Sequence, residues 1–139
     1  MPMKAAWVLI HDAARPCVSP QLIRRAVAAG KRYGAVACGV PAMLRVKAVD
    51  EDDEVRLTLD RERLWFVQTP QVFRRDWFTH ALSAAKHRLD QFPDDASIVE
   101  SDGFPVRMIL GDSLNVKVTT KEDVVLAEAI LARRTRRSE

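Results

Sequence analysis

The sequence predicts one α/β domain in which helices flank an open parallel sheet. Two observations predict this class: short apolar runs typical of buried strands alternate with segments of helical periodicity, and the chain shows no internal repeat. Its 139 residues suffice for one self-sufficient hydrophobic core. With 47% apolar and 29% charged residues, the composition excludes a disordered chain.

The first forty residues predict two buried strands with a helix between them. Ala6 to Ile10 and Ala35 to Val40 are apolar throughout, as in strands covered on both faces. Ser19 followed by Pro20 is typical of a helix start, and Gly34 of a helix end. The residues expected on the buried face of this helix are Leu22, Ala26, Ala29 and Tyr33.

Residues 41–63 differ in character and predict an exposed β-arm. Two short strand-like runs, Leu44 to Val49 and Val55 to Leu59, flank the acidic loop D-E-D-D-E at 50–54. We therefore expect a hairpin that stands away from the main sheet.

The remainder of the chain continues the alternation. Strands are expected at Leu64 to Thr69, Val106 to Leu110 and Asn115 to Val118, and helices at Arg75 to about Leu89 and just after Asp94. A capping box formed by Thr119 and Glu122 predicts the last helix. Its buried residues would be Val124, Ala127 and Leu131.

Charge and cysteine content narrow the cellular setting. The net charge of +3 depends on four arginines between 133 and 137, without which 18 basic residues face 19 acidic ones. We expect this tail to be a solvated terminus, so nucleic-acid binding is disfavoured. No apolar run exceeds six residues and no secretory signal is visible, which disfavours a membrane protein. Two cysteines are too few for a disulfide framework and favour a reducing, cytoplasmic compartment.

Polar residues at the ends of the predicted strands form the candidate site. Asp12 and Arg15 follow the first strand, Arg61 and Thr69 flank the central one, and Lys117 lies near the last. In open parallel sheets, ligands bind beyond the carboxyl ends of the strands. One carboxylate with several cations suits phosphates and a divalent metal, because oxygen ligands suit Mg²⁺ and guanidinium groups match phosphate oxygens.

Each of these residues also has an ordinary structural interpretation. An aspartate such as Asp12 commonly stabilises a turn, and arginines commonly form surface ion pairs. His11 is expected to make a structural hydrogen bond, and Cys17 to be a small buried hydrophobe. His80 and His87 are seven residues apart, which is a poor spacing for a metal site. The sequence contains no G-x-S-x-G, H-E-x-x-H or Walker motif, and its five glycines never cluster.

Four segments together identify a resemblance. They are W-V-L-I-H-D-A-A-R-P at 7–16, L-D-R-E-R-L-W-F-V-Q-T-P-Q-V-F at 59–73, D-D-A-S-I-V-E at 94–100 and N-V-K-V-T-T-K-E-D at 115–123. In this order they resemble the 2-C-methyl-D-erythritol 4-phosphate cytidylyltransferases of non-mevalonate isoprenoid biosynthesis. The resemblance implies a partial Rossmann-like, GT-A-like nucleotidyltransferase sheet. It also implies that residues 1–139 form the C-terminal portion of the family's single domain, after the glycine-rich loop that holds CTP.

The resemblance further implies roles for individual residues. Asp12 would hold Mg²⁺ near the nucleotide, and Arg15 would lie in the same substrate-facing loop. Arg61 and Lys117 would position the sugar-alcohol phosphate for attack on CTP, and Thr69 would contact that phosphate. The arm at 41–63 would embrace a second subunit in a homodimer and bring Arg61 to the partner's site.

Two departures from the family pattern leave alternatives open. Leu44 and Arg45 replace an Asp-Thr pair, although Arg45 could supply a charge to the substrate, and Pro93 replaces a threonine. The alternatives are a cytidylyltransferase acting on ribitol phosphate or another polyol phosphate, and a catalytically incompetent chain that only dimerises.

Overall fold

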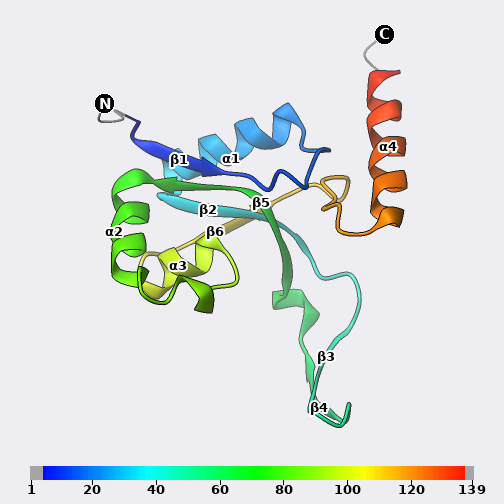
Figure 1. Ribbon diagram of the computed structural model, residues 1–139, viewed down its shortest axis with the longest axis horizontal. Coiled ribbons are helices and arrows are strands. Elements are labelled where there is room, and N and C mark those ends of the chain that lie inside the picture. The colour runs from blue at the N-terminus through cyan, green and yellow to red at the C-terminus, as the bar shows by residue number, and fades with distance from the viewer. Residues whose placement is uncertain (1–4, 137–139) are drawn as a thin grey trace.

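The computed structural model describes residues 5–136, which form a four-stranded sheet with helices on both faces and a projecting two-stranded arm (Figure 1). The strands are β1 (Trp7–Ile10), β2 (Ala35–Pro41), β3 (Val46–Val49), β4 (Val55–Leu59), β5 (Trp65–Arg74) and β6 (Arg107–Leu110). The helices are α1 (Pro20–Tyr33), α2 (Arg75–Ala85), α3 (Asp95–Ser101) and α4 (Lys121–Thr135), with short 3-10 turns η1 (Arg61–Arg63) and η2 (Leu89–Gln91). No helix in the described part is long and apolar enough to span a bilayer.

The main sheet is mixed, so the expectation of a parallel sheet is wrong. Its strand order is β1-β5-β2-β6, with β5 antiparallel to both neighbours and β2 parallel to β6. β1 lies at one edge, and its Leu9 is exposed, so the prediction of a first strand covered on both faces is also wrong. The second strand is buried as predicted, since residues 35–39 are all buried.

Alternation along β2 builds a separate core on each face. Val36 and Cys38 pack with α1, whereas Ala35 and Ala37 pack with α2 and α3. The approach of α1 to β5 is close: a Cβ on Gly30 would lie 2.5 Å from Cγ1 of Val72. The glycine in α1 is therefore explained by helix–sheet packing.

Strand β5 contains a bulge at the centre of the sheet. Its pairing with β2 moves from Ala37 opposite Gln71 to Cys38 opposite Gln68, so Thr69 and Pro70 have no partners on β2. Proline lacks an N–H and is accommodated where the ladder is interrupted. The predicted strand therefore continues to Arg74 instead of ending at Thr69.

Helix α1 starts as predicted, with the Ser19 side chain accepting the Leu22 N–H, and it ends at Gly34 with a φ of +89°. Helices α2 and α4 differ from their predictions. α2 ends at Ala85 instead of at about Leu89, because the Arg88 N–H donates to the Ala85 carbonyl and the chain turns into η2.

The capping box of α4 pairs Thr120 with Asp123, one residue later than predicted. Of the residues predicted to be buried in α4, Ala127 is confirmed, whereas Val124 and Leu131 are exposed and Ile130 is buried instead. The predicted strand at 115–118 is irregular chain, joined to the loop after β1 by a hydrogen bond from Val118 N–H to the Ala14 carbonyl.

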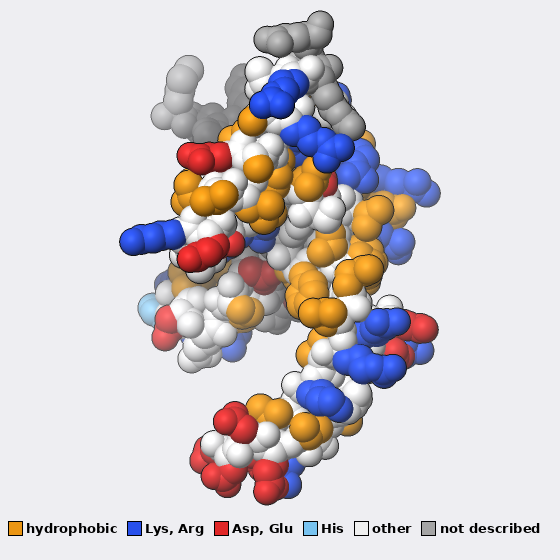
Figure 2. Space-filling model, turned by 90° about the vertical axis from the view of Figure 1, so that its right-hand side faces the viewer, with side chains coloured by type: hydrophobic (Ala, Val, Ile, Leu, Met, Phe, Trp, Pro, Cys, Tyr) orange, Lys and Arg blue, Asp and Glu red, His pale blue; other side chains and the backbone are white. Residues whose placement is uncertain are grey.

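The arm is confirmed as an antiparallel hairpin of β3 and β4 that projects from the sheet (Figure 1). The Asp50 carboxylate accepts N–H groups of Asp52 and Glu54 and stabilises the turn. Figure 2 shows acidic side chains gathered at the tip of the arm.

The arginine-rich end is not wholly a solvated tail. Arg134 lies in the last turn of α4, donates to the Cys17 carbonyl and forms an ion pair with Asp112 at 3.6 Å. It therefore ties α4 to two loops of the domain. Arg137, the last of the four arginines, lies outside the described residues.

Strand β5 carries three buried polar side chains, Gln68, Thr69 and Gln71. Gln71 is the most buried of the three, with 2% of its surface exposed. Its Oε1 accepts the Ala96 N–H at 3.0 Å, and its Nε2 donates to Asp94 Oδ2 at 3.3 Å. Gln71 therefore holds the start of α3 against the sheet.

We predict that Gln71→Leu destabilises the fold by about 1–3 kcal/mol, because the buried Ala96 N–H loses its acceptor. Urea denaturation followed by circular dichroism measures this change. As a matched control, Gln21→Leu on the exposed face of α1 should stay within about 0.5 kcal/mol of the parent. Equal stability of the two variants would contradict the assigned role of Gln71.

Candidate functional site

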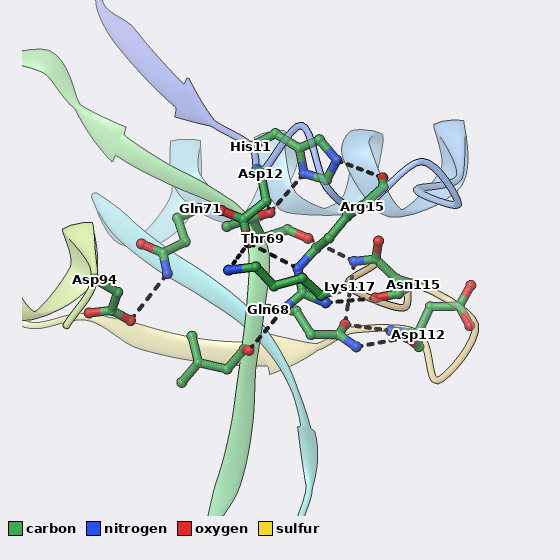
Figure 3. Close-up of polar contacts among 11 residues, drawn as sticks. His11, Asp12, Arg15, Gln68, Thr69, Gln71, Asp94, Asp112, Asn115 and Lys117 are labelled. Atoms are coloured by element: carbon green, nitrogen blue, oxygen red, sulfur yellow. Dashed lines mark hydrogen bonds and ion pairs between the residues drawn. The ribbon is translucent and has the colours of Figure 1, made fainter. Parts of the chain in front are cut away.

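A cavity of about 440 Å³ opens where the loop after β1 meets the bulge of β5 (Figure 3). It brings together four of the sequence-predicted site residues, Asp12, Arg15, Thr69 and Lys117, from three separate segments. The other lining residues are Val67, Gln68, Gln71, Pro93, Asp94 and Asp95.

Thr69 anchors the loop after β1. Its Oγ1 accepts the Asp12 N–H at 2.9 Å and lies 2.9 Å from Nδ1 of His11. The other imidazole nitrogen of His11 lies 3.2 Å from the Arg15 carbonyl. The prediction of a structural hydrogen bond for His11 is therefore confirmed.

Arg15 is a buried clamp, with only 10% of its side chain exposed. Its Nε donates to Asp12 Oδ2 at 3.3 Å, and its Nη1 donates to the Asn115 carbonyl at 2.7 Å. Its Nη2 lies 3.4 Å from the Val67 carbonyl. The guanidinium therefore joins three chain segments and fixes the Asp12 carboxylate.

Lys117 completes the charged centre of the cavity. Its Nζ lies 3.4 Å from Asp12 Oδ2, and about half of its side chain (49%) is exposed. Unlike Arg15, this ammonium group retains access to solvent and to a ligand. The Asp12 carboxylate is thus shared by one fixed cation and one accessible cation.

Amide side chains position the segment that carries Lys117. Gln68 pairs with the backbone of Asp112, since its Nε2 donates to the carbonyl at 2.9 Å and its Oε1 accepts the N–H at 3.2 Å. Asn115 is fully buried and donates to the Thr69 carbonyl at 2.7 Å. Both residues therefore attach the loop before Lys117 to the bulge of β5.

The opposite wall of the cavity is acidic. Asp94 and Asp95 begin α3, and the Asp94 side chain accepts the Ser97 N–H in a capping box. Burial raises the pKa of Asp95 above its ordinary value, and the neighbouring carboxylates of Asp94 and Asp12 raise it further. A ligand that fills the cavity meets cations on one side and carboxyl groups on the other.

Sequence reasoning did not select Gln68, Gln71, Asp94 and Asp95 as site residues. A usable signal existed for the two glutamines, because amides within a strand buried in a sheet must find hydrogen-bond partners. The aspartates resembled ordinary helix-capping residues, and only the packing of α3 places them on the cavity.

Arg45 and Arg61 lie on the arm and do not line the cavity of their own chain. Both are exposed, and Nη1 of Arg61 donates to the Met43 carbonyl at 3.0 Å. This contact holds Arg61 at the base of the arm, in the η1 turn.

The donor set fits a magnesium ion only in combination with substrate oxygens. Among residues 5–136 no group of three histidine, cysteine or acidic side chains could hold a metal. Mg²⁺ is commonly bound by one or two carboxylates together with phosphate oxygens and water. The partly exposed Asp12 carboxylate satisfies this requirement.

Comparison with known proteins places these features in a family. The family model for 2-C-methyl-D-erythritol 4-phosphate cytidylyltransferase matches residues 1–133. The enzyme of that name from Syntrophus aciditrophicus is 44% identical over 124 residues, which cover 89% of this chain and 53% of the relative. The one from Pelotomaculum thermopropionicum is 43% identical over 127 residues, covering 91% and 53%. The chain thus spans about half the length of the curated relatives it matches.

Solved structures agree with the sequence comparison. The crystal structure of the Thermus thermophilus cytidylyltransferase matches with a TM-score of 0.81 at 36% identity, covering 93% of this chain and 63% of that one. The 4-diphosphocytidyl-2C-methyl-D-erythritol synthase of Anaerococcus prevotii matches with a TM-score of 0.85 at 28% identity, covering 95% and 59%. The fold and the four quoted motifs therefore have one explanation: the chain belongs to the 2-C-methyl-D-erythritol 4-phosphate cytidylyltransferase family.

Proposed function

We propose that this chain forms part of the active site of an enzyme that transfers CMP from CTP to 2-C-methyl-D-erythritol 4-phosphate. The observation that carries the proposal is the cavity in which Arg15 fixes the Asp12 carboxylate 3.4 Å from the accessible Lys117 ammonium. Family membership supports the reaction, and the cavity supports the residues. We further propose a cytoplasmic location, in keeping with two buried, unpaired cysteines.

The proposed reaction joins two anions. An oxygen of the phosphate monoester bonds to the α-phosphorus of CTP, and the bond from that phosphorus to the β-phosphate bridging oxygen breaks, releasing pyrophosphate. The monoester has a second pKa of about 6 and is mostly dianionic at neutral pH, so no strong general base is needed. Catalysis therefore depends on alignment and on cations that offset repulsion.

Each cavity residue has a place in this scheme. Lys117 would hold the monoester in line with the α-phosphorus, and Thr69 lies beside the same space. Asp12 would hold Mg²⁺ jointly with the triphosphate, and this ion would offset phosphate charge when bound. Arg15 keeps the Asp12 carboxylate in place for that purpose.

We also propose a homodimer formed through the arm. Met43, Leu44 and Leu57 on the arm are exposed, and no helix or further strand of the described residues covers the two-stranded β3-β4 sheet. A second copy would cover these side chains and receive Arg61 and Arg45 near its own cavity. Arg61 would then help to align the monoester phosphate bound by the partner.

One observation favours a different acceptor as the second candidate. Pro93 lines the cavity, where the family pattern has a threonine, and so offers no hydroxyl to the substrate. Ribitol phosphate or another polyol phosphate is therefore the acceptor to compare with methylerythritol phosphate.

We predict that Lys117→Met lowers kcat/KM about 100-fold, because a cation that acts in the transition state is lost. Pyrophosphate release from CTP, Mg²⁺ and each acceptor measures this effect. Lys121→Met, at the exposed start of α4, is the control and should retain parental kinetics. If the parent chain binds no CTP·Mg²⁺ by calorimetry and releases no pyrophosphate, the non-catalytic alternative is favoured.

We predict a loss of about 100-fold in kcat/KM for Arg61→Ala and partial recovery in Arg61→Lys, which keeps the charge but not the planar fork. Arg63→Ala, in the same exposed turn, is the matched control. Mixing Arg61→Ala with Lys117→Met should restore about a quarter of parental activity, because half of the dimers then contain one intact composite site. Absence of complementation would contradict the cross-subunit role of Arg61.

A further inference from the structure

His11 is a chemically versatile residue that the proposed mechanism does not use. It sits between the end of β1 and the Asp12–Arg15 loop, yet it does not line the cavity. Both of its ring nitrogens are engaged by neighbouring groups, as Figure 3 shows. A general acid or base would need a nitrogen that faces the substrate, so His11 has a different role.

The hydrogen-bond directions follow from the chemistry of the partners. The Arg15 carbonyl can only accept, so Nε2 of His11 carries the proton and donates to it at 3.2 Å. In the neutral ring Nδ1 is then an acceptor, and the Thr69 hydroxyl donates to it at 2.9 Å. The same hydroxyl oxygen accepts the Asp12 N–H at 2.9 Å.

A single chain of hydrogen bonds therefore passes from Asp12 through Thr69 and His11 to Arg15. It holds both ends of a turn that is closed by the Arg15 N–H donating to the Asp12 carbonyl at 3.0 Å. The side chains at these two ends are the carboxylate and the guanidinium of the charged centre, 3.3 Å apart.

We propose that His11 is a positioning residue that orients the Thr69 hydroxyl and thereby sets the place of Asp12 in the cavity. With its hydrogen directed at His11, the Thr69 hydroxyl presents a lone pair, and not a donor, to the cavity. The inference rests on the proposed function for its kinetic consequence only.

The first experiment tests the hydrogen bonds and needs no enzyme activity. Imidazole ¹⁵N spectra should show His11 as the Nε2–H tautomer with an unprotonated Nδ1. Thr69→Val should speed amide exchange at Asp12 about tenfold, because the N–H loses its acceptor, while Thr69→Ser preserves the protection. His11→Gln should speed the same exchange several-fold, and His87→Gln, an exposed control, should leave it unchanged.

The second experiment is kinetic, and it distinguishes positioning of Asp12 from a general effect of His11 on the stability of the fold. His11→Gln should lower kcat about tenfold with little change in KM for CTP, and the double variant His11→Gln/Thr69→Val should fall no further than the worse single variant. Three results would each overturn the proposal. They are a loss of kcat in the double variant equal to the product of the two single losses, an Nδ1–H tautomer of His11, and an unchanged amide exchange rate at Asp12 in His11→Gln. If the chain has no turnover but the spectra and exchange follow expectation, the proposed function fails and the positioning of Asp12 by His11 stands.

Discussion

The cavity depends on the hydrogen bonds made by buried polar side chains at the bulge of β5. Gln68 holds the loop that leads to Lys117, Thr69 holds the loop of Asp12, and Gln71 holds the start of α3. Buried amides and hydroxyls must be paired, so each of these side chains determines which loop lies against it. Three walls of the cavity, formed by segments far apart in sequence, are thus held by three residues of one strand.

Within this frame, the two cations beside Asp12 have different tasks. Arg15 is almost fully buried, and its N–H groups donate to Asp12 and to backbone carbonyls, so it fixes the carboxylate. Lys117 is half exposed, and within residues 5–136 its ammonium group pairs with Asp12 alone, so it can move toward an incoming phosphate. A buried guanidinium that is already satisfied and an accessible ammonium complement each other, since one supplies geometry and the other supplies charge.

The sequence predicted features that depend on local chemistry. Ser19-Pro20 located the start of α1, the acidic loop located the arm, and the motifs brought Asp12 and Lys117 into one cavity. Strand direction was not predictable in the same way. The apolar run of β5 indicates a buried strand, but it carries no information on whether the neighbouring strands are parallel or antiparallel to it. The one-residue shift in α4 followed from Asp123 capping Thr120 in place of Glu122 capping Thr119.

The most direct test of the account is a crystal structure of this chain with CTP and Mg²⁺. We expect phosphate oxygens beside Lys117 and Asp12, with the hydrogen bonds from Gln68, Thr69 and Gln71 to the three loops intact. Nucleotide bound away from this cavity, or loops detached from the bulge of β5 in the occupied site, would contradict it.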